Sequence, residues 1–536
     1  MKQLIRWWLV ALVFSPTLAW GQEHYFVHFR DKQCIAGLLP DFAAKALARR
    51  ARHGIAFPLP DDYAVDPVYV AQVKARVTQL RHVLRWPNAV SVAATAEQIA
   101  AVAELPFVRS IEPFLPLQSL VAEEAVPAPV DERKLRRLYA LQRKLVGLDT
   151  LRAAGLTGKG VRIAVFDAGF RNLEDHPVFD SLWARAGVIE ARDFYRRRGK
   201  NPLRYSIHGT AVLGCITGWW GDQPIGAATQ AEILLARTEY GLRENVREQD
   251  AWMAAAEWAD QKGADIISSS LGYSNPLYEY AQMDGQTTRV AQAARTAIRK
   301  GILVVNSAGN QGDDDFHFIG SPADVDSVLT IGASYPMLRF PMRFSSFGPN
   351  AVGQPKPDVS GPGYVVTAGG SGLDTFTGTS FACPTVSGIA ACLMQRYPNK
   401  TNMEIRQMLV ESAHLYPYFD YAIGHGVVDA AQLLGAVRDT VAPTFALAFD
   451  ADTLVVQFDP EVLGPDSTFD VNGLPFFFHV EGAGGKLLEY RYLRITQGLK
   501  RVGIPPARLP RGKLRIWFAG YREEWDTDDL GRIPGL

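Results

Sequence analysis

Residues 375–397 read TFTGTSFACPTVSGIAACLMQRY, and this stretch decides both the fold and the question of function. It opens with small residues, Thr377–Ser380, and continues as an apolar run whose spacing predicts a helix buried in a core. Two interpretations of Ser380 at the helix start are open. Its hydroxyl can cap the helix by satisfying a backbone N–H, which is the commoner use of such a serine. It can also be a nucleophile, with helix N–H groups aimed at negative charge that develops beside it.

Strand and helix patterns alternate around this stretch, from residue 139 to about residue 440. The clearest strands are apolar runs that end in Gly or Asn, namely VRIAVFDAG (161–169), ADIISSSLG (264–272) and ILVVNSAGN (302–310). Fully apolar strands separated by helices predict a parallel sheet covered on both faces. Sites in such sheets lie beyond the carboxyl ends of the strands, where Asp167, Gly272 and Asn310 fall.

Two further units flank this sheet domain. Residues 22–120 mix strand and helix patterns and predict a small α+β unit, in which residues 69–84 are expected to be helical. Residues 121–138 are rich in Pro, Ala and charge, which predicts an exposed linker open to proteolysis. Residues 441–536 contain strand patterns separated by Gly and Pro turns, which predict a β-sandwich-like domain.

The composition excludes some classes of function. Lys+Arg and Asp+Glu both number 56, and this balance gives no support for a nucleic-acid partner. Residues 1–21 have a basic start, an apolar run and small residues at the end, which predicts a secretory signal. A membrane anchor is the alternative, but Pro16 and the shortness of the run favour the signal. We expect an exported protein, secreted or at the cell surface, with no membrane span in its mature form.

The four cysteines are too few for a disulfide scaffold. Cys383 and Cys392 fall nine residues apart on one predicted helix, so we do not expect them to pair with each other. Buried free thiols are the favoured interpretation for these two residues and for Cys34 and Cys215.

A nucleophilic serine needs a base, a carboxylate that holds the base, and donors for the oxyanion. The sheet domain offers Asp167 at a strand end, His208 in SIHGT at a predicted helix start, and Asn310 in SAGN. Each has a commoner structural interpretation, as a turn residue, a cap or a satisfied polar group. Together they stand at element boundaries in the order Asp…His…Ser, which is one of the three chain orders of the serine triad.

These motifs make the domain resemble the subtilisin family (subtilases) of serine peptidases. The resemblance is carried by IAVFDAGF around Asp167, HGTAVLG around His208, ISSSLGY at 267–273, VVNSAGN ending at Asn310, and FTGTSFACPTVSG around Ser380. The particular residues in these motifs, together with LARTE at 235–239, are similar to those of subtilases from Bacteroidetes-type bacteria. Residues 90–113 are similar to the end of subtilase propeptides.

The resemblance implies an α/β fold, with a subtilisin-like parallel sheet covered by helices over residues 139–440. A small α+β propeptide would precede it, acting as an intramolecular inhibitor and chaperone, and a β-sandwich-like domain would follow it. The precursor would be cut in the linker, between about residues 115 and 140. Protein or peptide substrates are implied, and no cofactor. Structural calcium is known in the family, but its ligands cannot be placed in this sequence.

The resemblance also assigns roles to matched residues. Ser380 would attack the scissile carbonyl, His208 would act as base and then as acid, and Asp167 would fix the imidazole tautomer. The Asn310 side chain and the Ser380 N–H would form the oxyanion hole. An extended substrate would pair with three residues that follow one strand, Ser270, Leu271 and Gly272. The pocket for the residue before the cut would be walled by Ala308, Gly309 and Asn310.

Some features depart from the family pattern or admit other functions. Ala168 stands where the family usually has Ser or Thr, and Ala211 where it often has His, but no triad or oxyanion residue is missing. A catalytically silent binding protein is one alternative. A surface adhesin, in which residues 441–536 do the work, is another. The acidic run Asp313–Asp315 is interpreted as a solvated loop, with calcium binding as its alternative.

Overall fold

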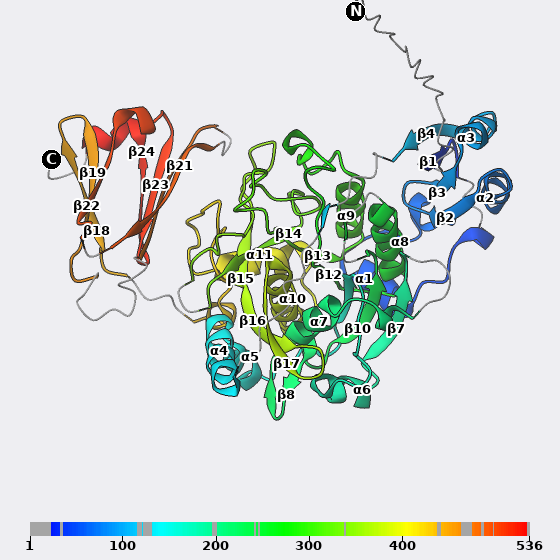
Figure 1. Cartoon of the computed structure of the whole chain (residues 1–536), viewed down its shortest axis with the longest axis horizontal. Helices are drawn as coiled ribbons and strands as arrows, with labels where there is room; N and C mark the ends of the chain where they lie inside the picture. Colours follow the sequence, from blue (N-terminus) through cyan, green and yellow to red (C-terminus); the bar gives the residue numbers. More distant parts are fainter. Residues whose placement is uncertain are drawn as a thin grey trace, which may run out of the picture.

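The fold is described from a computed structural model that covers residues 23–32, 36–114, 120–121, 131–195, 201–240, 243–244, 247–336, 339–436, 441–462, 474–483, 487–496 and 498–532. Three units follow one another along the chain (Figure 1). We call them the N-terminal unit (23–121), the central unit (131–436) and the C-terminal unit (441–532). The predicted fold class is confirmed, with an α/β central unit between a small α+β unit and a strand-rich one.

The central unit is built on a seven-stranded parallel sheet with the strand order β15-β14-β13-β12-β6-β10-β7. Its strands are β6 (Arg162–Asp167), β7 (Val188–Asp193), β10 (Glu232–Arg237), β12 (Ile266–Ser269), β13 (Leu303–Ser307), β14 (Leu329–Ser334) and β15 (Val359–Pro362). The helices of the unit include α5 (Leu148–Ala153), α6 (Asp180–Ala184), α7 (His208–Thr217), α8 (Arg247–Gln261), α9 (Arg289–Arg299), α10 (Thr379–Arg396), α11 (Asn402–Ser412) and α12 (Ala430–Leu433).

Side chains of the inner strands alternate between two hydrophobic cores. On β6, Ile163 and Val165 lie in the core that contains residues of α7 and α10. Ala164 and Phe166 lie in the core that contains residues of α8 and α9. This period of two is that of a strand covered on both faces, which is why these strands read as unbroken apolar runs.

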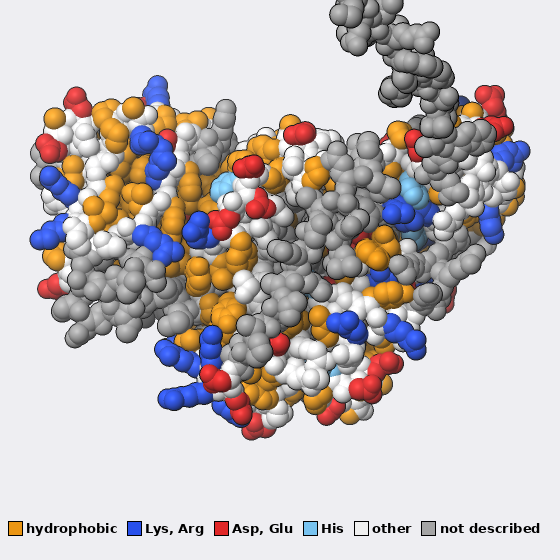
Figure 2. Space-filling model, viewed as in Figure 1, with side chains coloured by type: hydrophobic (Ala, Val, Ile, Leu, Met, Phe, Trp, Pro, Cys, Tyr) orange, Lys and Arg blue, Asp and Glu red, His pale blue; other side chains and the backbone are white. Residues whose placement is uncertain are grey.

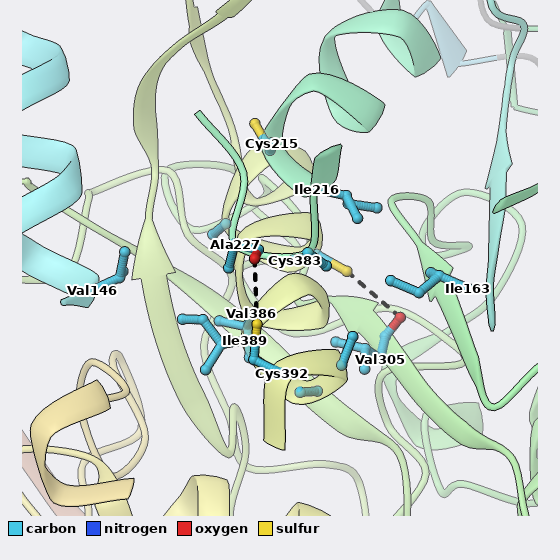
Figure 3. Packing of buried hydrophobic residues seen from close by; sticks show 14 of the residues in the cluster. Val146, Ile163, Cys215, Ile216, Ala227, Val305, Cys383, Val386, Ile389 and Cys392 are labelled. Carbon is cyan, nitrogen blue, oxygen red and sulfur yellow. Dashed lines mark hydrogen bonds between the residues drawn. The ribbon is translucent and has the colours of Figure 1, made fainter. Parts of the chain in front are cut away.

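Helix α10 passes through the first of these cores. Its side chains Cys383, Val386, Ile389 and Cys392 pack among residues from distant parts of the chain (Figure 3). The Cys383 thiol donates to the Val305 carbonyl at 3.5 Å, and the Cys392 thiol donates to the Ala227 carbonyl at 3.3 Å. Burial raises the pKa of both thiols to about 12.

The buried free thiols predicted from the sequence are confirmed for three of the four cysteines, Cys215, Cys383 and Cys392. Cys34 lies outside the described residues. Among the helices of the described ranges, none has both the length and the hydropathy that crossing a membrane requires. On the face drawn in Figure 2, acidic and basic side chains are interspersed, in keeping with the zero net charge.

The N-terminal unit is a four-stranded antiparallel sheet with helices. Its strands are β1 (Glu23–Phe29), β2 (Gln79–Leu84), β3 (Ala89–Ala94) and β4 (Val108–Pro113), and its helices are α1 (Ala44–Arg52), α2 (Pro67–Lys74) and α3 (Ala96–Ala103). The helix predicted over residues 69–84 is wrong in its second half, because Gln79–Leu84 forms β2 and pairs with β3. Tertiary pairing with a neighbouring strand overrides the helical spacing of the apolar residues there.

Buried ion pairs join the N-terminal unit to the C-terminal ends of α8 and α9. Arg49 donates to the Lys300 carbonyl at 3.1 Å and also pairs with Asp260. Arg50 lies 2.8 Å from Asp260 and 2.9 Å from Asp62. All these side chains are almost fully buried. Because an isolated buried charge is costly, each of these groups depends on partners from the other unit.

Two more carboxylates of α8 bind the same unit. Asp250 accepts from Arg81 at 2.7 Å. Glu257 accepts from the backbone N–H groups of Arg85 and Trp86, each at 2.8 Å. Three acidic side chains along α8 thus contact the N-terminal unit, which lies against α8 in Figure 1.

The linker expected over residues 121–138 is shorter in the structure. Helix α4 (Glu132–Val146) begins inside that segment, with the Asp131 side chain accepting from the Lys134 N–H at its start. Leu135 and Leu138 of α4 pack in the first core of the central unit. Their helical spacing places them on one buried face, and this apolar contact outweighs the charged composition of the segment. Residues 122–130 lie outside the described residues.

The C-terminal unit contains two antiparallel sheets, in agreement with the predicted β-sandwich-like domain. One sheet contains β18 (Phe445–Asp450), β19 (Thr453–Phe458) and β22 (Arg501–Ile504). The other contains β21 (Leu487–Ile495), β20 (Leu474–Glu481), β23 (Lys513–Phe518) and β24 (Tyr521–Asp526). Buried side chains from both sheets, among them Leu454, Phe476 and Ile516, form a single core between them.

A buried acid, Asp420, lies where the central and C-terminal units meet. Its Oδ1 accepts from the Ala422 N–H at 2.8 Å and from the Tyr490 hydroxyl at 3.3 Å. Burial raises the pKa of Asp420 to about 7. The folded state therefore holds this proton more tightly than the unfolded chain does. This contribution to stability is full below about pH 4 and is lost as the pH rises through about 7.

We therefore expect Asp420→Asn to weaken the pH dependence of stability. The amide keeps an acceptor for Ala422 and Tyr490 and cannot ionise. The melting temperatures of both proteins should be measured at about pH 5 and pH 8. The melting temperature of the wild-type protein should fall more over this pH interval than that of the Asp420→Asn variant. Equal losses would show that Asp420 does not titrate in this range.

Candidate active site

Four polar residues predicted from the sequence are brought to the carboxyl edge of the central sheet. Asp167 is the last residue of β6, and Asn310 follows the end of β13 by three residues. His208 is the first residue of α7, and Ser380 is the second residue of α10. Parallel strands have their carboxyl ends at one edge, so residues from four separate segments of the chain meet there.

Asp167 and His208 form a close pair. The Asp167 side chain is fully buried, and His208 Nδ1 lies 3.0 Å from each of its carboxylate oxygens. The Ala168 N–H donates to Asp167 Oδ1 at 2.7 Å and orients the carboxylate further. An ionised carboxylate only accepts hydrogen bonds, so Nδ1 is the donor, and Nε2 of the imidazole is then able to take up a proton.

Ser380 is not the N-cap of its helix. That position is occupied by Gly378, which has no side chain with which to cap the helix and whose φ of 152° is one that side chains disfavour. The capping interpretation of Ser380 is therefore wrong. The Ser380 hydroxyl instead donates to the Ser270 carbonyl at 3.3 Å.

Pro384 explains a second contact at this helix start. It has no N–H and cannot donate to the carbonyl four residues earlier, which is that of Ser380. The Ser270 hydroxyl donates to this carbonyl instead, at 2.8 Å. Two hydrogen bonds thus join Ser380 to the segment after β12, and both place its side chain at the sheet edge. The proline lies in the second turn of the helix.

Ser380 and His208 are brought together by the packing of α10 against α7. The Phe381 ring, directly after Ser380, lies with its centroid 5.3 Å from that of the His208 imidazole. The start of α10 and the His208 imidazole therefore lie next to each other on the same side of the site.

Asn310 is tied to the same helix start. Its side-chain oxygen accepts from the Thr379 N–H at 3.0 Å and from the Thr379 hydroxyl at 2.8 Å. These two bonds use the oxygen and turn the amide nitrogen toward Gly378, where a β-carbon built on the glycine would lie 3.5 Å from Nδ2. The orientation places the Asn310 amide nitrogen, whose two N–H bonds are donors, near the start of α10.

The five residues expected to bind substrate lie beside these groups. Ser270, Leu271 and Gly272 follow β12, and the Leu271 carbonyl accepts from the Asn306 side chain at 2.9 Å. A β-carbon built on Gly272 would approach only the Ser321 carbonyl, at 3.8 Å, so there is space beside this glycine on its side-chain side. Ala308 and Gly309 lead into Asn310, and the Gly309 carbonyl accepts from the Ser346 N–H at 3.0 Å.

One residue of the site was not predicted. Arg237 ends β10, is fully buried, and its register partner on β6 is Asp167. Its Nε donates to the Ala168 carbonyl at 2.9 Å, and its Nη1 lies 3.0 Å from Asp193. The Tyr205 ring lies 3.6 Å from the guanidinium carbon. In the sequence, Arg237 stands out as a single cation at the end of the apolar strand AEILLAR. Only the structure shows that its side chain binds the backbone directly after Asp167.

The acidic run Asp313–Asp315 is exposed, and Asp313 pairs with Arg343 at 3.3 Å. Within the described residues, no group of three or more His, Cys, Asp or Glu side chains is arranged to hold a metal ion.

Two family matches cover the N-terminal and central units. The subtilase family (peptidase S8) matches residues 158–426. The peptidase S8 propeptide domain of Bacteroidota matches residues 24–127, which confirms the resemblance of the N-terminal unit to propeptides and to that lineage.

Individual relatives agree with these matches. Serine protease AprX of Bacillus subtilis (strain 168) is 29% identical over 306 residues, which cover 51% of this chain and 66% of AprX. The chain thus spans just under two thirds of that relative. Subtilisin of Bacillus pumilus is 30% identical over 292 residues, which cover 52% of this chain and 92% of the subtilisin.

Among solved structures, the serine protease MycP1 aligns with a TM-score of 0.46 and 23% identity, over 60% of this chain and 95% of that one. The family match extends over half of the sequence and includes all four residues at the sheet edge. The chain belongs to the subtilase family (peptidase S8), with a propeptide domain of the same family ahead of its central unit.

Proposed function

We propose that this protein is a secreted serine endopeptidase that cuts extended protein substrates through an Asp167–His208–Ser380 triad. The observation that carries the proposal is the buried Asp167 carboxylate, with both oxygens 3.0 Å from His208 Nδ1. This pair fixes the imidazole tautomer in which Nε2 accepts a proton, and it stabilises the imidazolium that forms.

The chemistry follows from this arrangement. The Ser380 oxygen attacks the carbonyl carbon of the substrate while its proton passes to His208 Nε2. The carbonyl oxygen becomes negatively charged and is bound by the Asn310 side-chain N–H and the Ser380 backbone N–H. His208 then returns the proton to the leaving amine, and water hydrolyses the acyl-enzyme by the same steps. Ser270–Gly272 supply backbone groups to which an extended substrate adds as a strand.

Labelling of the mature protein with a fluorophosphonate probe tests this proposal. The probe should react at Ser380, and peptide mass mapping of the labelled protein locates the modified residue. A properly folded mature protein that takes up no label would contradict the proposal and favour a silent binding protein. Label at another serine would contradict the assignment of Ser380.

We expect Asn310→Ala to lower kcat by about 10²- to 10³-fold with little change in KM. This range is that of removing one oxyanion donor, and it was measured in subtilisin, a member of this family. The reason is that the amide nitrogen acts on charge present only in the transition state. The kinetics of a chromogenic peptide substrate give both constants. A variant that keeps the wild-type kcat would show that Asn310 is not a donor to the oxyanion.

The N-terminal unit is proposed to keep the precursor inactive. Strand β5 (Leu120–Val121), where that unit ends, pairs antiparallel with β11 (Arg243–Glu244). β11 follows the carboxyl end of β10 by six residues, and β10 ends beside Asp167. A chain segment that adds as a strand at this edge of the sheet would occupy space that an extended substrate needs. Residues 1–21, which lie outside the described residues, are proposed as the secretory signal.

A further inference from the structure

The outer face of the C-terminal β21-β20-β23-β24 sheet is buried against the central unit. On β20, Phe476 and Phe478 lie in the core of the sandwich, whereas Phe477 between them lies in a second cluster. That cluster joins Phe477 and Trp517 to three residues of the central unit, which are Leu415, Tyr418 and Ile423. Both faces of this sheet are thus covered, one by its partner sheet and the other by the central unit.

Polar contacts reinforce this junction. Arg522 of β24 donates through Nη1 to the carbonyls of Leu415 at 3.0 Å and Tyr416 at 2.9 Å. Tyr490 of β21 donates to the buried Asp420 at 3.3 Å. The hydrogen bonds fix the register of the apolar contact, because each requires a particular alignment of two backbones or side chains.

From this junction a chain of contacts leads to the loop after Asn310. The Tyr490 ring meets the Phe347 ring edge to face, with centroids 6.3 Å apart. The His317 imidazole stacks on the Phe347 ring, with the two centroids 4.3 Å apart. His317 Nδ1 donates to the Gly312 carbonyl at 2.7 Å. Gly312 lies two residues after Asn310.

The last link of this chain has little freedom. The Gly312 N–H donates to the Phe344 carbonyl at 2.8 Å, and the Ser346 N–H donates to the Gly309 carbonyl at 3.0 Å. The two segments run so close together that a β-carbon on Gly312 would lie 2.3 Å from the Ser345 carbonyl. A displacement of Phe347 is therefore passed to the backbone on both sides of Asn310, since no space is left to absorb it.

We propose that the C-terminal unit positions the oxyanion loop, with Tyr490 as the positioning residue that supports Phe347 and, through it, residues 309–312. The proposal rests on the function proposed above for Asn310. It makes the C-terminal unit part of the peptidase and gives a role to residues that follow the end of the subtilase match at residue 426. The adhesin interpretation of residues 441–536 does not require any contact between Tyr490 and this loop.

The first test measures the loop itself and needs no activity. In full-length protein carrying Ser380→Ala, the further change Tyr490→Ala should speed amide hydrogen exchange in residues 309–318 and 344–348 by about tenfold, the effect of losing one aromatic contact. Tyr490→Phe keeps the ring and should exchange like the parent. Tyr492→Ala is the matched control, because Tyr492 lies on the same strand and its ring meets Phe477 at 5.2 Å. Unchanged exchange in Tyr490→Ala, or equal changes in both alanine variants, would overturn the proposal.

The second test measures catalysis in the processed enzyme. Tyr490→Ala should lower kcat on peptide p-nitroanilides by about fivefold to tenfold with KM within about twofold, because a shifted Asn310 loses stabilisation of the transition state only. Tyr492→Ala should lower the melting temperature and leave kcat within about twofold. A wild-type kcat in Tyr490→Ala would overturn the proposal while leaving the serine mechanism intact. A wild-type protein that is inactive and takes up no label would instead refute the proposed function. The exchange measurement would still show whether Tyr490 supports residues 309–312.

Discussion

Ser380→Ala is expected to lower kcat for peptide-bond hydrolysis by about 10⁴- to 10⁶-fold. This is the range caused by loss of a triad member, and the upper figure of about 10⁶ was measured in subtilisin, a relative of this protein. The alanine lacks the oxygen that attacks the substrate, while the Asp167–His208 pair and the Asn310 donor remain. The residual rate over water would come from the oxyanion donors and substrate binding alone. Steady-state kinetics on a chromogenic peptide, with active-site titration of the wild type, measure this ratio.

The same variant tests maturation. If the protein cuts its own chain, Ser380→Ala should accumulate as a full-length precursor that lacks only the signal, when it is expressed in a host without other secreted proteases. Intact mass and N-terminal sequencing identify the species. Ser387→Ala is the control, because Ser387 lies on the same helix with its hydroxyl buried against Ser268 at 2.9 Å. Normal trimming of Ser380→Ala would exclude self-processing, and loss of activity in Ser387→Ala would point to disruption of the helix.

The second large effect is expected at the buried ion pairs that hold the N-terminal unit. Asp260→Asn removes the charge that pairs with both Arg49 and Arg50 and leaves two buried cations with less compensation. We expect the free energy for opening α1 from the central unit to fall by about 3 kcal/mol, the lower end of the cost of breaking a buried pair, because Arg50 keeps Asp62. Hydrogen exchange of residues 44–52 in the Ser380→Ala precursor measures this opening.

An exposed ion pair provides the control for this measurement. Asp326 pairs with Arg295 at 3.1 Å, and 46% and 34% of the two side chains are exposed. Asp326→Asn should change the opening free energy by less than about 1 kcal/mol, because solvent screens such a pair. Similar protection in Asp260→Asn and in the parent would show that apolar contacts, and not the buried charges, hold the unit in place.

The sequence predicted the positions of two site residues, Asp167 and Asn310, because each lies at or just after the end of a buried strand. Unbroken apolar strands require a covered parallel sheet, and a parallel sheet brings its carboxyl ends to one edge. Asp167 and Asn310 could therefore be placed together without a structure. The roles of these residues come from the family resemblance and remain to be tested by the variants above.

Other features depend on contacts that the sequence does not reveal. Gln79–Leu84 has apolar residues at helical spacing, and only its pairing with β3 makes it a strand. Asp260 meets Arg50 across 210 residues of sequence, so neither charge indicates its partner. By contrast, the consecutive aromatic residues Phe476–Phe478 carried a usable signal. Adjacent strand residues point to opposite faces, so such a run predicts that both faces of its sheet are covered.

The buried thiols allow the local unfolding of individual helices to be measured by alkylation. A thiol with a pKa near 12 presents almost no thiolate to an alkylating reagent at neutral pH, and the surrounding core blocks access as well. Burial also raises the pKa of the Cys215 thiol to about 12, so Cys215 on α7 and Cys392 on α10 can react only after their helices open. With excess reagent, the rate at which each peptide gains mass reports how often the helix that carries it leaves the core. The opening rates of α7, which carries His208, and of α10, which carries Ser380, can thus be measured separately in the wild-type protein.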